Sequence, residues 1–280
     1  MRQIHVDKVK EAVEQAVLQA NTQLPEDITA ALRRFLDKEQ SPNARRLLQI
    51  TLENADLARN ECMALCQDTG LVVVDMELGQ EVMLIGGDLE TAINQGIRDG
   101  YRRGYFRKSV VKDPLERINT GDNTPAVIHM HLVPGNVLKL NILPKGGGSE
   151  NMGQLTMLKP SQGLEGVKDF IVKVVREAGA NPCPPIIVGV GVGGNMEKAA
   201  LLAKKALMRE IGTTNPIPTL AALEEEMLSI VNGLGVGPQG MGGDTTALAV
   251  HIETYPTHIA CLPVAVNLGC HSTRRVTVEL

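Results

Sequence analysis

The chain has 280 residues, a hydrophobic content of 43% and a formal net charge of −4. Aromatic residues make up 2% of the chain and tryptophan is absent, whereas nucleic-acid-binding proteins usually present stacking aromatic side chains or a basic surface. No apolar run approaches the roughly 20 residues of a membrane span, and the N-terminus lacks the apolar core of a secretion signal. These features predict a cytoplasmic protein that binds neither nucleic acid nor membrane.

The first 65 residues are expected to be helical. Apolar residues recur there at helical spacing, and Pro25 followed by Glu26 and Asp27 is typical of a first helical turn. The expected helices cover residues 6–18, from 25 onward, 43–65 and 89–102. Gly70 closes a turn before an apolar strand that begins at Leu71.

The rest of the chain alternates strands and helices. Further strands are expected over residues 126–133, 137–143, 186–192, 245–254 and 259–268, and further helices over 167–178, 196–211 and 220–231. The turn residues 134–136 (Pro-Gly-Asn) favour a direct pairing of the first two of these strands. No repeat or linker is visible. The sequence therefore predicts one domain over residues 1–280, an α/β (mixed α+β) fold with mixed sheets surrounded by helices and a helical N-terminal region.

Five cysteines without regular spacing argue against a disulfide framework. Cys62 falls in an expected helix and Cys261 in an apolar strand, as is typical of ordinary buried thiols. Cys66, Cys183 and Cys270 differ, because each lies where a regular element ends among polar residues or prolines.

Three such settings favour a shared metal site, with plain burial as the alternative. Zinc would ordinarily need a fourth protein ligand, and electron-transfer clusters use four cysteines. Three separated thiolates suit a cubane cluster in which one iron lacks a protein ligand and can act as a Lewis acid. A zinc site or a non-catalytic iron–sulfur protein remains an open alternative.

Charged residues near these cysteines suggest acid/base work and anion binding. Asp68, two residues after Cys66, could transfer a proton or simply form the turn. Arg107 ends a basic cluster that begins with Arg102 and Arg103. The latter two are expected to lie on a solvated face, whereas Arg107 could bind a carboxylate, because arginine suits bidentate carboxylate binding. His258, taken alone, is more typical of a structural histidine.

Glycines 189, 191 and 194 match the dinucleotide pattern G-x-G-x-x-G. A loop and another helix are expected after the next helix, instead of a parallel strand that ends in an acidic residue. The pattern therefore disfavours nucleotide binding. A nucleotide-dependent enzyme is kept as a third alternative.

Six blocks of sequence resemble the class I fumarate hydratase and L-tartrate dehydratase family, in its α-subunit part. They occur in the family's order and extend over most of the chain: CQDTG at 66–70, NTGDNTPA at 119–126, KGGGSEN at 145–151, NPCPP at 181–185, GPQGMGGDTT at 237–246, and GCHS at 269–272 with Arg274.

The resemblance implies a 4Fe–4S cluster with one iron not ligated by protein. The cluster ligands of the family correspond to Cys66, Cys183 and Cys270. The resemblance also implies an acid/base role for Asp68 and substrate-binding roles for four residues: Gln67, Arg107, Gly148 and His258.

The activity implied by the resemblance is the reversible hydration of fumarate, a small dicarboxylate, to L-malate. Single-chain members carry a further domain with more acid/base groups, including the base on the opposite face of the substrate. The resemblance thus implies a separate β subunit and an α2β2 type of oligomer. L-tartrate dehydratase is the alternative within the family.

Overall fold

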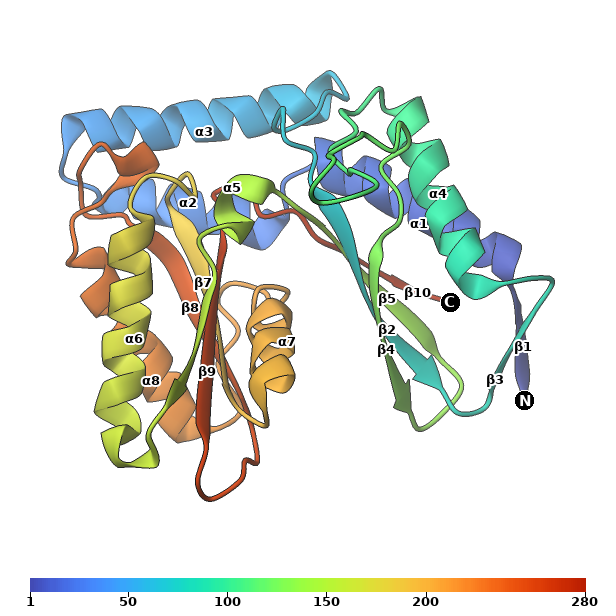
Figure 1. The fold of residues 1–280 in the computed structure, drawn as a ribbon. Coiled ribbons are helices and arrows are strands. Elements are labelled where there is room, and N and C mark those ends of the chain that lie inside the picture. The colour runs from blue at the N-terminus through green and yellow to red at the C-terminus, as the bar shows by residue number, and fades with distance from the viewer. The chain divides into compact units, whose positions relative to one another are not determined.

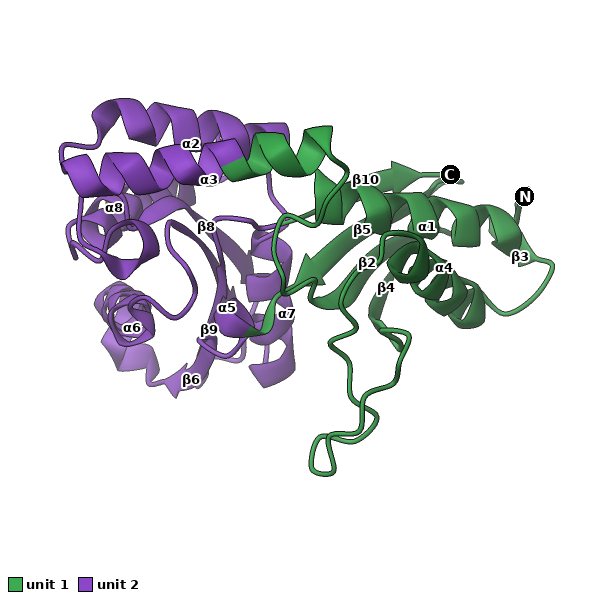
Figure 2. Cartoon of the chain, turned by 90° about the horizontal axis from the view of Figure 1, so that it is seen from above, with its two compact units in different colours: residues 1–25, 54–147, 274–280 green, residues 26–53, 148–273 purple.

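The computed structural model describes all 280 residues and confirms the mixed α/β fold class. The chain divides into two compact units (Figure 2). Unit 1 comprises residues 1–25, 54–147 and 274–280, and unit 2 comprises residues 26–53 and 148–273. Each unit is assembled from separate segments, which explains why no linker is visible in the sequence. The single domain over residues 1–280 stays a prediction.

Unit 1 is a four-stranded sheet with two helices packed on one face (Figure 1). The strand order is β10 (Val276–Glu279), β5 (Leu138–Lys145), β2 (Leu71–Gly79), β4 (Val127–Val133). Helices α1 (Val6–Thr22) and α4 (Leu89–Arg103) bury their apolar stripes with the even-numbered side chains of β2. A small parallel pair, β1 (Arg2–His5) and β3 (Val82–Ile85), completes the unit.

The expected hairpin of the strands around residues 126–143 is wrong. β2 lies between them, parallel to β4 and antiparallel to β5. The connection passes over the end of β2, where the Gln80 amide donates to Val133 O and the Glu81 amide to Gly135 O. A Cβ on Gly79 would lie 2.5 Å from Gly135 O. Because Val72, Val73, Val74 and Met76 of β2 are all buried, the burial of β2 in the sheet centre outweighs the local turn preference.

Unit 2 has a second four-stranded sheet, covered on both faces (Figure 1). Its order is β6 (Gln154–Leu158), β9 (Leu262–Gly269), β7 (Ile186–Gly193), β8 (Ala247–Tyr255). Helices α6 (Gly163–Ala178) and α8 (Pro218–Asn232) form the main core with one face, and α7 (Met196–Ala206) packs on the other. Further elements with residues in this unit are α2 (Glu26–Lys38), the first part of α3 (Pro42–Asn60), α5 (Gly147–Glu150), η1 (Pro160–Gln162) and η2 (Pro238–Gly240).

The glycine run in β7 serves helix packing. A Cβ on Gly191 would lie 2.1 Å from Ala199 O of α7, and a Cβ on Gly189 would lie 2.3 Å from Ala203 O. β8 does lie parallel beside β7, which the sequence did not lead us to expect. These two glycines nevertheless face the α7 backbone, so the positions that a dinucleotide pyrophosphate would approach are filled by a helix.

Helix α3 (Pro42–Asn60) ends five residues before the expected boundary. Cys62 therefore lies outside it, exposed and with a φ of 53°, so the prediction of a buried helical thiol at this position is wrong. Cys261 is partly buried and immediately precedes β9. None of the helices is both long enough and apolar enough to cross a membrane.

Candidate active site

In unit 1, residues 66–70 form a turn that orients the Asp68 carboxylate. Asp68 Oδ1 accepts a hydrogen bond of 3.0 Å from the Gly70 amide. Asp68 Oδ2 accepts one of 2.7 Å from the Gly147 amide, which begins α5. A Cβ on Gly146 would lie 3.1 Å from Oδ2. The loop after β5 thus comes close to the carboxylate because it is built of glycines.

The backbone of the same turn is held from the inside. Arg274 Nη2 donates to Asp68 O at 2.7 Å, and the Tyr101 hydroxyl donates to Thr69 O at 2.5 Å. Arg274 and Tyr101 are both buried. Burial raises the pKa of Tyr101 to about 12, so its hydroxyl keeps its proton and remains a donor at neutral pH.

The third carbonyl of the turn is held by a long loop that connects α4 to β4. Asn123 Nδ2 donates to Gly70 O at 3.0 Å, and Asn123 Oδ1 accepts from the Ser109 amide at 2.6 Å. Asp122 in the same loop forms an ion pair of 2.8 Å with Arg98 of α4. The pKa of Asp122 lies at about 2, because hydrogen bonds from Arg98 and a neighbouring threonine outweigh the opposing effect of burial.

This loop carries Arg107 to the turn. Arg107 Nη1 donates to Gln67 Oε1 at 2.6 Å, and Arg107 O accepts from Thr69 Oγ1 at 2.5 Å. The Gln67 and Arg107 side chains are exposed. Unit 1 therefore brings together four predicted site residues: Cys66, Gln67, Asp68 and Arg107.

In unit 2, the segments that carry Cys183 and Cys270 are bonded to each other. The His271 amide donates to Cys183 O at 3.2 Å, and His271 Nδ1 lies 2.9 Å from the same oxygen. Gln239 Nε2 lies 3.1 Å from His271 Nδ1 and donates to Pro184 O at 3.1 Å. Gln239 thus bridges the two cysteine-bearing segments.

A buried glutamate holds the glycine-rich loop from which Gln239 extends. Both carboxylate oxygens of Glu39 accept from the Asp244 amide at 3.0 Å, and one accepts from Thr245 Oγ1 at 2.7 Å. Burial by itself would raise the pKa of Glu39, but these hydrogen bonds outweigh it and the pKa is lowered. A Cβ on Gly243 would lie 3.0 Å from the same carboxylate.

The cysteine side chains are accessible at these loops. Cys183 is exposed and has a φ of 54°, and Cys66 and Cys270 are partly buried. Cys270 O accepts from Thr273 Oγ1 at 2.8 Å, which fixes the end of its segment. Neither unit by itself brings together three histidine, cysteine or acidic side chains as metal ligands.

His258 is not brought together with the cysteines of unit 2. His258 precedes β9 and Cys270 follows β9, so the eight-residue strand separates the two residues by roughly 25 Å. His258 lies with Lys198 and Tyr255 along an open groove at the start of α7, at the opposite end of the sheet. Gly148 lies in α5 beside Gly147.

The sequence missed two groups that contact the turn. One is the Gly147 amide, which donates to Asp68 Oδ2; the substrate-binding role implied for the neighbouring Gly148 stays a prediction. Arg274 was part of a quoted motif without a role. Its only sequence signal is its place in that motif, four residues after Cys270.

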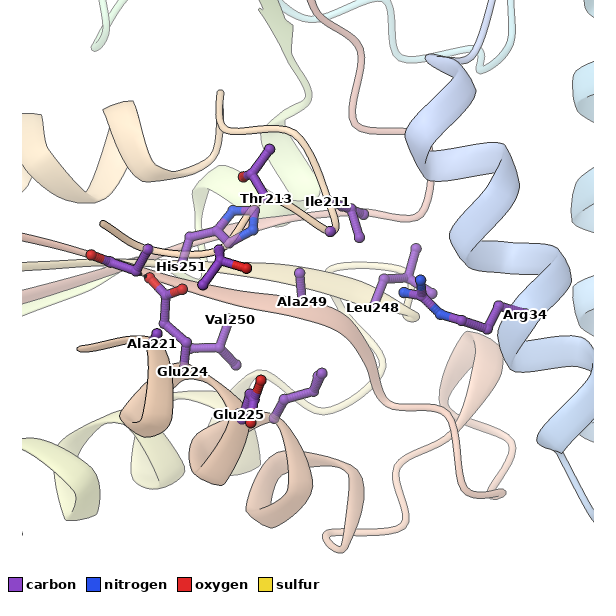
Figure 3. A pocket seen from close by; sticks show the side chains of 14 residues that line it. Arg34, Ile211, Thr213, Ala221, Glu224, Glu225, Leu248, Ala249, Val250 and His251 are labelled. Atoms are coloured by element: carbon purple, nitrogen blue, oxygen red, sulfur yellow. Dashed lines mark hydrogen bonds between the residues drawn. The ribbon is translucent and has the colours of Figure 1, made fainter. Parts of the chain in front are cut away.

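Unit 2 also contains a cavity of about 170 Å³ between α8, β8 and residues 211–215 (Figure 3). Its buried carboxylate, Glu224, already accepts from Arg209 Nη1 at 2.6 Å and from Asn215 Nδ2 at 2.8 Å. His251, also at the cavity, is buried and has its Nδ1 3.1 Å from Ala206 O. None of the predicted site residues lines this cavity. Its buried carboxylate already has hydrogen-bond partners within the protein, as buried charged groups usually do.

Comparison with known proteins identifies the family. Residues 10–279 match the family described as "Fumarate hydratase (Fumerase)". The "Putative L(+)-tartrate dehydratase subunit alpha" of Methanocaldococcus jannaschii is 39% identical over 278 residues, which cover 96% of each chain. The L(+)-tartrate dehydratase subunits alpha of Escherichia coli O157:H7 and K12 are 32% and 31% identical, covering 99% of this chain and 92% of theirs. The chain therefore belongs to the fumarate hydratase (Fumerase) family and is a hydro-lyase.

Proposed function

We propose that the chain is the α subunit of an iron–sulfur hydro-lyase that catalyses the reversible hydration of fumarate to L-malate. One observation carries the proposal: Arg107 contacts Gln67, next to a carboxylate that two backbone amides orient. A cationic side chain that binds anions and an oriented acid/base group are what the addition of water to a dicarboxylate requires.

In the proposal, Cys66, Cys183 and Cys270 hold a 4Fe–4S cluster with one iron not ligated by protein. The donor set fits: all three cysteines lie outside helices and strands and none forms a disulfide, and thiolates are the usual cluster ligands. When bound, the cluster supplies a Lewis acid for a substrate oxygen. Cys62 and Cys261 have no part in it.

The other roles belong to side chains and amides of this chain. Asp68 gives a proton to, or takes it from, the oxygen that is added to or lost from the substrate. Arg107 binds a substrate carboxylate through the donors that Gln67 does not use. Backbone amides of the glycine loop at 146–148 stabilise the charge that develops on a carboxylate.

We further propose a β subunit as partner, in an α2β2 type of assembly. The relatives are named as subunits alpha, which supports a partner. The base on the opposite face of the substrate is assigned to that subunit. Full hydratase activity of the purified, cluster-loaded α chain alone would contradict this dependence.

L(+)-tartrate dehydration is the second candidate, and the names of the relatives favour it. Both reactions need a dicarboxylate site and the loss of a hydroxyl group, and tartrate carries one more hydroxyl than malate. Turnover of L-malate and L(+)-tartrate by the same assembled αβ preparation separates the two. A ratio of kcat/KM values far above one for either substrate decides the assignment.

The cluster is tested by anaerobic reconstitution with iron and sulfide, followed by iron counting and EPR. We expect close to four irons per chain in the wild type and in Cys62→Ala and Cys261→Ala. Cys66→Ala, Cys183→Ala and Cys270→Ala should each lose most of the iron. A cluster that tolerates these three changes, or iron replaced by zinc on four ligands, would overturn the proposal.

A further inference from the structure

Arg274 is an unusual buried cation. Its side chain is 2% exposed, and no aspartate or glutamate forms an ion pair with it. Nη2 donates to Asp68 O at 2.7 Å, Nη1 lies 3.4 Å from Asn21 Oδ1, and Nε has no partner. Burying an incompletely paired charge costs free energy, so a purely structural role would be served better by a neutral side chain.

The guanidinium lies on the inner side of the turn whose outer side carries the proposed chemistry. It holds the carbonyl of Asp68, while the Gly147 amide holds the carboxylate of the same residue. A Cβ on Gly146 would lie 3.1 Å from Asp68 Oδ2 and 3.9 Å from Arg274 Nη2. Gly146 of the glycine loop therefore lies close to both the carboxylate of Asp68 and the guanidinium of Arg274.

We infer that Arg274 is a positioning residue for Asp68. By fixing the backbone carbonyl of Asp68, Arg274 holds the residue where its carboxylate accepts from the amides of Gly70 and Gly147. This inference rests on the proposed function for the catalytic role of Asp68, but the positioning itself can be measured without catalysis.

A lysine cannot replace Arg274 in this role. The guanidinium is a planar fork whose two terminal nitrogens point to acceptors on two separate segments, Asn21 of α1 and the turn at Asp68. A lysine ammonium carries the same charge on one nitrogen, without the fork. Comparison of arginine, lysine and methionine at position 274 therefore separates geometry from charge.

The test compares Arg274→Lys and Arg274→Met with the wild type as full-length chains and as assembled αβ enzyme. Hydrogen exchange at the Gly70 and Gly147 amides reports on the turn, and kcat and KM report on the reaction. Arg103→Gln is the matched control, because it removes an exposed positive charge of the same unit that pairs with Glu14.

We expect both Arg274 variants to exchange the two amides at least about tenfold faster, with unchanged exchange in β2 and β7. We expect kcat to fall about 100-fold and KM to change less than about threefold, since Asp68 acts in the chemical step. Lysine should not rescue kcat. Arg103→Gln should match the wild type in every measurement.

Wild-type exchange at both amides, or a lysine variant with wild-type kcat, would overturn the inference. If Arg274→Met does not fold, Arg274→Lys decides, together with Tyr101→Phe, which removes the bond to the adjacent Thr69 carbonyl. Tyr101→Phe should accelerate exchange at Gly70, and an unchanged rate counts against the inner support of the turn. If the wild-type assembly lacks hydro-lyase activity, the proposed function fails while amide exchange still decides the positioning.

Discussion

Arg107 Nη1 and Gln67 Oε1 are joined by a hydrogen bond of 2.6 Å across forty positions of sequence. The resemblance implied a substrate role for each residue separately, and the fold of unit 1 brings them into contact. Replacing Arg107 by alanine removes the positive charge and leaves Gln67 without this partner. In the proposed function, this guanidinium is the group that binds a substrate carboxylate.

We expect Arg107→Ala to lower kcat/KM of the assembled enzyme by about 10- to 100-fold, mainly through KM. A hydrogen bond to a charged group contributes about 1.5–3 kcal/mol, and 1.4 kcal/mol corresponds to about a factor of ten. Arg107→Lys should recover only part of the loss. Steady-state kinetics measure both, with the exposed Arg102→Gln as control. An Arg107→Ala enzyme with wild-type KM would exclude carboxylate binding by this residue.

Gly191→Ala should destabilise unit 2, because its Cβ would lie 2.1 Å from Ala199 O of α7. Overpacking of this kind typically costs about 1–3 kcal/mol, which denaturant unfolding can detect. Gly233→Ala is the control. Gly233 has a φ of −64°, and a Cβ added there would have its nearest atom 3.3 Å away. We therefore expect the free energy of unfolding to change by no more than about 0.5 kcal/mol. Equal effects of the two substitutions would argue against the packing role of the β7 glycines.

Glu39→Gln should also destabilise the chain, in a pH-dependent way. The amide group of glutamine places a donor where the carboxylate accepts from Asp244 and Thr245, at a cost of about 1–3 kcal/mol. The folded-state pKa of Glu39 is lowered from 4.5. Its stabilising effect is therefore complete above about pH 4.5 and is lost as the pH falls through the folded-state pKa.

The measurement for Glu39 is the difference in free energy of unfolding between wild type and Glu39→Gln at a series of pH values from 7 downward. The difference should be constant near neutral pH and should shrink below pH 4.5. A difference that grows on acidification would have the wrong sign for a lowered pKa.

Gln239→Leu should weaken iron retention without removing a thiol. Gln239 bonds to Pro184 O and contacts His271, so its loss frees the Cys183 and Cys270 segments from this bridge. We expect chelator to remove iron from the reconstituted variant several-fold faster than from the wild type, at a similar melting temperature. The exposed Gln40→Leu serves as control. Identical chelation rates would show that the bridge has no part in holding the cluster.

His258→Asn should leave the iron content unchanged, because β9 separates His258 from Cys270 by roughly 25 Å. The substrate role implied for His258 stays a prediction, and within one copy of unit 2 its position does not support it. Iron counting on the variant checks the first point. A large loss of iron would mean that the two ends of β9 are coupled through the sheet.

Local signals in the sequence determined much of the secondary structure. The strands at 71, 127, 186, 247 and 262 and the helices α1, α2, α4, α6 and α8 were expected close to their observed places, because periodicity and turn residues act over short distances. The roles of the three candidate cysteines and of Asp68 were implied by the resemblance of short sequence blocks and stay predictions.

Only the tertiary structure decided which segments meet. It inserted β2 between β4 and β5, turned Gly189 and Gly191 toward α7, and directed Arg274 to the carbonyl of Asp68. It also separated His258 from Cys270 by the length of a strand. Strand order and buried long-range hydrogen bonds depend on the competition of all segments for one core. No local pattern encodes that competition, so a chain position such as 274 acquires its partner only when the sheet is assembled.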